Sequence, residues 1–263
     1  MKIRALRGFA FDLDGTIWAG QALLPGAAEL LAALRAAGHR VVALTNSSRL
    51  LSSELSERLQ GLGIPLGPAD VLAALDLLGE TIKRRLGTVA VLPLGTHEMD
   101  QVLKAAGHTI VAIEDWAQAE AVAIGNDPAF DFARLRAASR AIAAGAAFFT
   151  INLDPRLPAG GGQFDPGCGA LAEAIAVASG TRPFVIGKPH RPIFDMALER
   201  LGCQPSEAAM VGDSQATDIA GGRAAGMFTI WLDPAADHHE HTQADLTVRN
   251  LIELHELWNG TRG

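Results

Sequence analysis

The sequence has few of the features that mark secreted, membrane-bound or nucleic-acid-binding proteins. Its only cysteines, Cys168 and Cys203, lack metal-ligand spacing and are too few for a disulfide framework. No window holds 18 consecutive apolar residues, and the opening MKIRALRG runs directly into a predicted strand, so we expect neither a membrane span nor a secretory signal. The net charge of -7 argues against a broad nucleic-acid-binding surface. We therefore expect a soluble cytoplasmic protein.

What the chain does contain is a regular alternation of strand and helix patterns. Leucines at helical spacing predict a helix over residues 27–37, and a β-branched strand follows at residues 40–44. A second amphipathic helix is predicted to end near Gly61. The same alternation returns over residues 192–232. Strands and helices joined by short links predict βαβ units and a parallel sheet.

The 263 residues, 49% of them hydrophobic, are long for one compact domain and sufficient for two. Residues 78–183 carry strand and helix patterns of their own, so we expect a smaller α/β domain inserted into a larger one made of residues 1–77 and 184–263. A glycine-rich stretch at residues 159–162 interrupts the inserted region and predicts a mobile loop.

Two carboxylates follow the first predicted strand in the stretch FAFDLDGTIW. Asp12 and Asp14 are two positions apart, so in an extended chain both side chains point to the same side and repel each other. A metal ion or a proton bound between them would relieve that repulsion. An ordinary turn also explains Asp14 and the glycine after it, but it explains Asp12 poorly.

Other polar residues lie where ligands bind in open α/β sheets, beyond the carboxyl ends of the strands. These residues are Thr45, Asn46, Ser47, Lys188, Asp213 and Asp218. Each alone also fits a helix cap, a turn or a solvated charge, but their joint occurrence at strand exits favours one shared site. Carboxylates with water and phosphate oxygens are the ligands that Mg²⁺ prefers, so the set indicates a magnesium and phosphate site.

Two further stretches leave alternatives open. The sequence DHHEH includes His238, His239 and His241 and offers transition-metal ligands, but an irregular surface loop is the favoured interpretation because no helix or strand frame fixes its geometry. Trp18 fits equally well as a residue that lines the leaving-group side of the site and as ordinary packing.

The four polar blocks resemble, in order, the four motifs of the haloacid dehalogenase-like (HAD) phosphatases. They are DLDGT, LTNSS, GKP and GDSQATD. The segments INLD, QFDPGCGAL and VIGKPHRPIFDMALERLG are similar to the NagD-like branch of that superfamily. The resemblance implies a Rossmann-like parallel-sheet core with an inserted class IIA cap domain. Caps of this class often contribute to dimer contacts, so it also implies a homodimer.

The resemblance also implies a mechanism. Asp12 would be the nucleophile that forms an aspartyl-phosphate, and Asp14 would be the acid that protonates the leaving group and then the base that activates water. Mg²⁺ would be held by Asp12, Asp213 and the backbone carbonyl of Asp14. Asp218 would orient Lys188 or a metal-bound water. The residues that would bind the phosphoryl oxygens are Thr45, Asn46, Ser47 and Lys188.

Three other functions use a similar set of residues. A receiver module is phosphorylated without turnover, but it would lack the DGT sequence after Asp12 and the inserted domain. A true dehalogenase would not need Asp14. A binding protein on the same fold would not need the complete acidic set.

The substrate is expected to be a small phosphorylated metabolite. Asn152 and Asp154 follow the predicted strand AAFFTI, and the resemblance implies that this part of the cap faces the substrate. An amide can bind a base edge or a sugar hydroxyl, so nucleoside monophosphates such as UMP are the first substrates to test. Sugar phosphates, phosphoglycolate and glycerol phosphate are the alternatives, and a turn capped by Asn152 and Asp154 is the simpler structural explanation.

Overall fold

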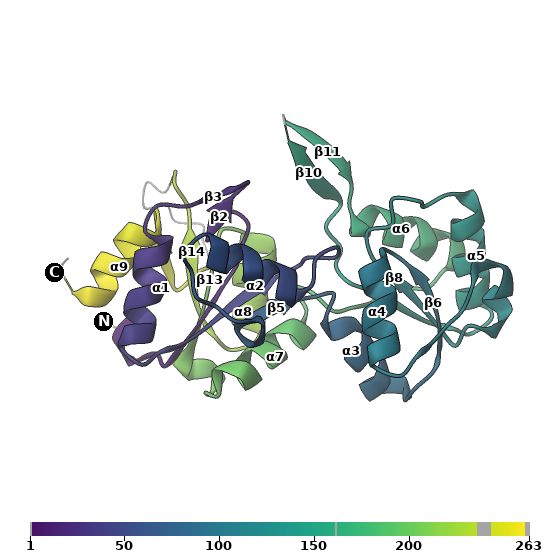
Figure 1. Cartoon of the computed structure of the whole chain (residues 1–263), viewed down its shortest axis with the longest axis horizontal. Coiled ribbons are helices and arrows are strands. Elements are labelled where there is room, and N and C mark those ends of the chain that lie inside the picture. Colours follow the sequence, from purple (N-terminus) through teal and green to yellow (C-terminus); the bar gives the residue numbers. More distant parts are fainter. Residues whose placement is uncertain (1, 161, 236–242, 261–263) are drawn as a thin grey trace. The chain divides into compact units, whose positions relative to one another are not determined.

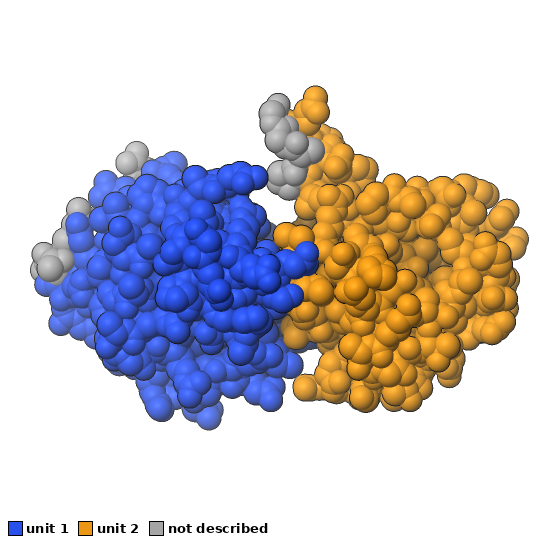
Figure 2. Space-filling model, in the orientation of Figure 1, with its two compact units in different colours: residues 1–45, 52–72, 188–263 blue, residues 46–51, 73–187 orange. Residues whose placement is uncertain are grey.

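The computed structural model describes residues 2–160, 162–235 and 243–260. The chain forms two compact units, coloured separately in Figure 2. The first consists of residues 1–45, 52–72 and 188–263, and the second of residues 46–51 and 73–187. The region predicted as an insertion, residues 78–183, falls within the second unit. That unit also includes the short segment 46–51, which follows the predicted motif-two strand.

The first unit contains a six-stranded sheet in the order β15-β14-β13-β1-β4-β5, and Figure 1 labels β14, β13 and β5 of this sheet. Its central strand β1 pairs in parallel with β13 on one side and with β4 on the other. All residues of β1 and β13 are buried, as expected for strands of a parallel sheet that is covered on both faces. The predicted parallel α/β core is confirmed.

The strands of this sheet are β1 (Gly8–Phe11), β4 (Arg40–Thr45), β5 (Val71–Ala73), β13 (Ala208–Gly212), β14 (Phe228–Leu232) and β15 (Leu246–Val248). The helices of the first unit are α1 (Ala27–Ala36), α2 (Ser52–Gly61), α7 (Arg191–Leu201), α8 (Ala220–Ala224) and α9 (Leu251–Asn259). Helices α1 and α9 pack against each other (Figure 1). A two-stranded hairpin, β2 (Trp18–Ala19) with β3 (Ala22–Leu23), follows β1.

The second unit contains a separate sheet in the order β12-β9-β8-β6-β7, and its paired strands are parallel. Its strands are β6 (Ala90–Leu94), β7 (Thr109–Ile110), β8 (Ala121–Ile124), β9 (Ala147–Thr150) and β12 (Phe184–Val185). Its helices are α3 (Leu77–Leu86), α4 (His97–Ala105), α5 (Phe132–Ala143) and α6 (Cys168–Ser179). Apolar side chains of β8, α5 and α6 form its buried core.

The glycine-rich stretch differs from the prediction. Strand β10 (Arg156–Gly160) pairs antiparallel with β11 (Gln163–Pro166), so Ala159 and Gly160 of the predicted loop belong to a strand. Glycine composition alone cannot distinguish these two outcomes, because glycines also occupy hairpin turns.

The elements that were not predicted from the sequence include the β2–β3 hairpin, α3, α6, β15 and α9. The strands β2, β3 and β15 are two or three residues long, which is too short for a periodic pattern. Helix α6 is apolar on most of its surface, so it lacks the one-sided pattern that marks an amphipathic helix. Among the described residues, no helix is long and apolar enough to cross a bilayer.

Candidate active site

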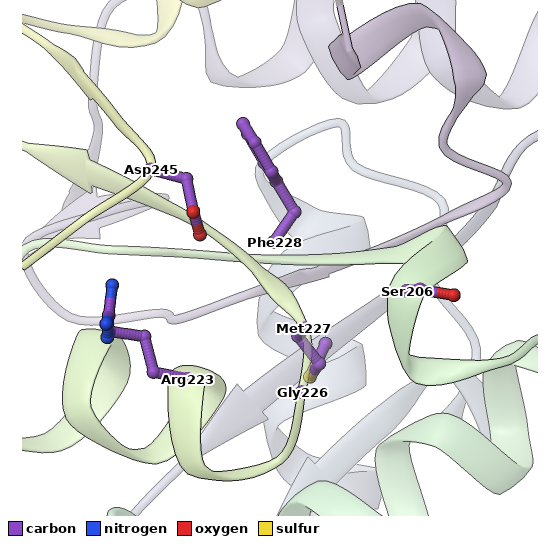
Figure 3. Close-up of a pocket in the computed structure, with 6 residues that line it drawn as sticks. All are labelled: Ser206, Arg223, Gly226, Met227, Phe228 and Asp245. Carbon is purple, nitrogen blue, oxygen red and sulfur yellow. The ribbon is translucent and has the colours of Figure 1, made fainter.

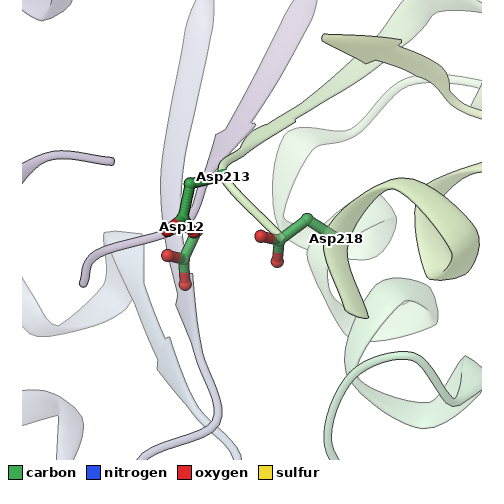
Figure 4. Close-up of side chains that lie close together, drawn as sticks. All are labelled: Asp12, Asp213 and Asp218. Atoms are coloured by element: carbon green, nitrogen blue, oxygen red, sulfur yellow. The ribbon is translucent and has the colours of Figure 1, made fainter. Parts of the chain in front are cut away.

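Three carboxylates meet at the carboxyl edge of the larger sheet (Figure 4). Asp12 follows β1 directly, and Asp213 follows the neighbouring strand β13. Asp218 lies in a π-helical segment, Gln215–Ile219, that leads into α8. One oxygen from each of the three carboxylates lies within 4.8 Å of the others. Three like charges so close together need positive charge between them.

Lys188 supplies part of that positive charge. Its Nζ lies 2.5 Å from Oδ1 of Asp12 and 2.7 Å from Oδ1 of Asp218, and it donates a hydrogen bond to the carbonyl oxygen of Leu44 at 3.3 Å. Lys188 is 4% exposed, Asp12 is 6% exposed and Asp218 is fully buried. Buried ion pairs of this kind persist because removing one partner would leave the other charge unpaired in a poorly solvated place.

The local backbone keeps Asp218 turned toward Lys188. The backbone N–H of Ser214 donates to Oδ2 of Asp218 at 3.1 Å, so both oxygens of this carboxylate have partners. A side chain at Gly212 would clash, because a Cβ there would lie 2.3 Å from Oδ2 of Asp218. Asp218 therefore contacts the ammonium group of Lys188 through Oδ1 and the backbone of Ser214 through Oδ2.

The electrostatics of the site indicate a shortage of positive charge. Burial raises the pKa of Asp12 to about 8, against the opposing attraction of Lys188, and Asp218 raises it further. Burial also raises the pKa of Asp213, again with a contribution from Asp218. For Lys188, burial acts to lower the pKa, but Asp12 and Asp218 outweigh it and the net shift is upward. Lys188 therefore stays charged, and the carboxylates would still bind a further positive charge.

The donor set fits a hard divalent cation. Asp213 is exposed at its strand end, and Lys188 pairs with Oδ1 of Asp12, so Asp213 and the Oδ2 of Asp12 can offer carboxylate oxygens to Mg²⁺. Gly15 has a φ of +86°, and a Cβ at this position would lie 2.2 Å from Oδ2 of Asp213. The glycine after Asp14 thus allows the first and fourth motifs to approach each other closely.

Asp14 lies apart from this cluster and is bound differently. Its side chain is exposed, and its Oδ1 accepts a hydrogen bond from the indole Nε1 of Trp18 at 2.8 Å. Trp18 itself is completely buried. The ring therefore packs in the core while its N–H reaches a predicted site residue, a contact that the sequence analysis did not anticipate. The sequence signal for this contact is that Asp14 and Trp18 are four residues apart, with a Gly-Thr turn between them.

The predicted substrate-binding residues of the second unit form their own hydrogen-bonded group. Asn152 is buried, and its Nδ2 donates to the carbonyl oxygen of Asn46 at 2.7 Å. Its Oδ1 accepts from the backbone N–H of Asp154 at 3.0 Å, and Nδ2 of Asn46 donates to Oδ2 of Asp154 at 3.2 Å. Ser47 bonds locally, to the backbone of Leu50. Asn152 thus caps the turn at Asp154, as the simpler structural explanation predicted.

The remaining sequence candidates do not join the carboxylate cluster. Thr45 is buried at the end of β4, at the same sheet edge as Asp12. Cys168 is buried in the second unit, where burial raises the pKa of its thiol and makes it a poor nucleophile. The predicted histidine loop, with His238, His239 and His241, lies outside the described residues.

A surface pocket of the first unit lies at the opposite, amino edge of the sheet (Figure 3). Its lining residues are Ser206, Arg223, Gly226, Met227, Phe228 and Asp245. Oδ2 of Asp245 accepts hydrogen bonds from both the N–H and the hydroxyl of Thr229, so the pocket's carboxylate is already bound within the protein. This pocket is separate from the carboxylate cluster.

Comparison with known proteins identifies the family of this chain. Residues 9–109 match the haloacid dehalogenase-like hydrolase family, and residues 185–254 match the HAD-hydrolase-like family. The glycerol-3-phosphate phosphatase of Homo sapiens is 34% identical over 246 residues, which cover 84% of this chain and 76% of that protein. The chain belongs to the haloacid dehalogenase-like hydrolases. The match confirms the resemblance seen in the four sequence motifs.

Solved structures place this HAD hydrolase within a narrower group. The 4-nitrophenylphosphatase of Thermotoga maritima has a TM-score of 0.88 and 27% identity, covering 98% of this chain and 99% of that one. NagD from E. coli K-12 has a TM-score of 0.84 and 26% identity, covering 94% and 98%. The chain is therefore a NagD-like phosphoric monoester hydrolase. The two matched sequence segments contain Asp12, Lys188, Asp213 and Asp218, whereas Asn152 lies between them.

Proposed function

We propose that this HAD phosphatase hydrolyses small phosphomonoesters with Mg²⁺, through a covalent phosphate on Asp12. The observation that carries the proposal is the buried contact of Lys188 with Asp12 and Asp218, in a cluster whose carboxylates still favour an added positive charge. Such a site suits the approach of a dianionic phosphate to a carboxylate, which is otherwise repulsive.

The side chains of this site divide the reaction into two steps. A carboxylate oxygen of Asp12 attacks phosphorus, and the bond from phosphorus to the leaving oxygen breaks as Asp14 transfers its proton to that oxygen. Water then attacks the phosphorus, Asp14 takes a proton from the water, and the bond to Asp12 breaks to release phosphate. Asp14 suits this shuttling role because its carboxyl group is exposed at the strand exit.

Asp12, Asp213 and the backbone carbonyl of Asp14 would hold the metal. When bound, Mg²⁺ supplies charge neutralisation between the phosphate and the nucleophilic carboxylate. Lys188 adds a second positive charge beside Asp12, and Asp218 keeps the ammonium group in place. Thr45, Asn46 and Ser47 are the other proposed ligands of the phosphoryl oxygens.

The proposed substrates are small phosphomonoesters, with glycerol phosphate the first to test. The human relative is named for that substrate and is 34% identical to this chain over 246 aligned residues. UMP stays a prediction, and its structural motivation is weaker, because the Asn152 amide already bonds the backbone of Asn46 and Asp154. Sugar phosphates and phosphoglycolate belong in the same screen.

One assay tests the reaction and the metal together. Phosphate release from p-nitrophenyl phosphate should require Mg²⁺ and stop with excess chelator, and Asp213→Ala should raise the Mg²⁺ concentration needed for half-maximal rate. Activity that persists in chelator would remove the metal from the proposal. A stoichiometric phosphoprotein without turnover would instead indicate a phospho-switch, and no reaction with any phosphomonoester would indicate a binding protein.

A further inference from the structure

The indole N–H of Trp18 makes a hydrogen bond to a residue of the candidate site. Its ring is completely buried, yet its N–H donates to Oδ1 of the exposed Asp14 at 2.8 Å. An indole nitrogen is a donor only, and a buried donor needs an acceptor. The acceptor here is the carboxyl group that the proposed function makes responsible for proton transfer.

The backbone between the two residues holds this contact in place. The carbonyl oxygen of Leu13 accepts from the N–H groups of both Ile17 and Trp18, and the N–H of Gly15 donates to the carbonyl of Trp18 at 2.7 Å. Asp14 and Trp18 also form a parallel β-bridge. The turn thus returns the indole to the carboxylate, and the β2–β3 hairpin continues from it.

Helix α2 fixes the ring from a second direction. The guanidinium carbon of Arg58 lies 4.0 Å from the centre of the Trp18 ring, and Arg58 also donates to the carbonyl oxygen of Gly20 in the β2–β3 turn. A cation over the ring face is attracted by the ring's electrons, which limits how the ring can turn. The donor that meets Asp14 is therefore held by two separate elements.

Resting on the proposed function, we propose that Trp18 is a positioning residue for the general acid. The indole N–H occupies Oδ1 of Asp14, so Oδ2 is left to carry the transferable proton and the exposed carboxyl group cannot rotate freely. In the first step this proton passes from Oδ2 to the leaving oxygen as its bond to phosphorus breaks. A correctly oriented acid accelerates the step only when the leaving group needs a proton.

The test uses two substrates that differ in this need. Glycerol phosphate leaves as an alkoxide that requires protonation, whereas p-nitrophenyl phosphate leaves as a stable phenolate. The quantity to compare is kcat/KM, because it includes only the steps up to loss of the leaving group. We expect Trp18→Phe to lower kcat/KM for glycerol phosphate by roughly 10- to 100-fold and for p-nitrophenyl phosphate by less than about threefold.

Replacing one atom of the Trp18 side chain separates the effect of the hydrogen bond from the effect of the ring's size. Incorporating β-(3-benzothienyl)alanine at position 18 keeps the size of the indole but replaces its N–H with sulfur, so it should reproduce the same split between substrates. Trp231→Phe is the matched control. The indole N–H of Trp231 donates to the backbone carbonyl of Asp213 at 2.8 Å, and losing this hydrogen bond should change kcat/KM equally for both substrates.

Two outcomes would overturn the role of Trp18. One is an equal loss on both substrates in Trp18→Phe, and the other is wild-type kinetics in the benzothienylalanine protein. If the wild-type protein hydrolyses both substrates and either outcome is found, only this inference fails. If the wild-type protein hydrolyses neither, the proposed function fails. Should glycerol phosphate prove a poor substrate, methyl phosphate provides the alkyl leaving group.

Discussion

The two parallel sheets of this protein use polar residues at their strand exits in opposite ways. In the larger sheet, Asp12 and Asp213 follow adjacent strands and lie close to Asp218, and Lys188 pairs with Asp12 and Asp218. In the smaller sheet, β9 is followed by Asn152 and Asp154, whose polar groups bond to each other and to Asn46. The carboxylates of the larger sheet leave negative charge that another cation can neutralise. The polar groups of the smaller sheet already have hydrogen-bond partners within the protein.

The strand next to β9 shows the same satisfied pattern. Strand β8 is followed by Asn126, which accepts from Arg49 at 2.6 Å and donates to the carbonyl of Pro166 at 2.9 Å. Asp127 accepts from the backbone N–H of Ala129 and pairs with Arg134 at 3.1 Å. Similar residue types after a strand thus form either a reactive cluster or a structural network, depending on whether neighbouring side chains satisfy them.

The largest expected effect comes from removing the nucleophile. Asp12→Asn should lower phosphate release from p-nitrophenyl phosphate by at least about 1,000-fold, because an amide cannot form the acyl phosphate. Circular dichroism should show an intact fold. The same change at Asp127, the carboxylate after β8, is the control and should leave the rate within about threefold of wild type. Near wild-type turnover by Asp12→Asn would rule out the covalent mechanism.

The second prediction concerns the buried ammonium group. Lys188→Met should lower the free energy of unfolding by about 3 kcal/mol, because Asp12 and Asp218 would be left buried without their partner. Adding Asp218→Asn should recover part of that loss. Denaturant titration measures both, with the exposed Lys83→Met as a control that should have almost no effect. Equal stability of Lys188→Met and wild type would show that water reaches Asp12 and Asp218 and that these carboxylates do not need the ammonium group.

The third prediction follows from the raised pKa of Asp12, about 8 instead of the usual 3.8. A raised carboxyl pKa stabilises the folded metal-free protein below pH 4, and this contribution is lost as pH rises toward and through 8. The Tm of Asp12→Asn in chelator should therefore rise relative to wild type, by about 5 °C between pH 5 and pH 9.

Differential scanning calorimetry in chelator provides this measurement. Mg²⁺ should raise the Tm of the wild-type protein more at pH 8.5 than at pH 5, since the cation replaces the bound proton. A Tm difference between Asp12→Asn and wild type that stays constant with pH would contradict the assigned direction of the shift.

The smallest expected effect lies in the second unit. Asn152→Ala combined with Asp154→Ala should change the ranking among glycerol phosphate, UMP and sugar phosphates by a few-fold, and should leave p-nitrophenyl phosphate hydrolysis within about threefold. Initial rates at matched substrate concentrations measure the ranking. An unchanged ranking would show that these residues only hold Asn46 in place and that other residues of the second unit determine specificity.

The four motifs and the parallel core could be predicted because both depend on local pattern. Asp12 and Asp213 stand directly after adjacent strands of one sheet, so topology alone brings them to one edge, and Lys188 lies in the link between β12 and α7. The contact of Trp18 with Asp14 could not be predicted, since it depends on how the turn closes over Gly15 and how Arg58 from α2 meets the ring.

The sequence by itself therefore determined the alternation of strands and helices, the family and the identity of the charged groups. Only the tertiary structure decided which of those groups have hydrogen-bond or ion-pair partners within the protein. The reason is physical: periodicity and motif spacing are properties of neighbouring residues, whereas the contacts of Asn152 with Asn46 and of Lys188 with Asp12 and Leu44 join segments more than 100 residues apart. Burial and pairing across such separations decide whether a polar side chain holds the fold together or remains available for chemistry.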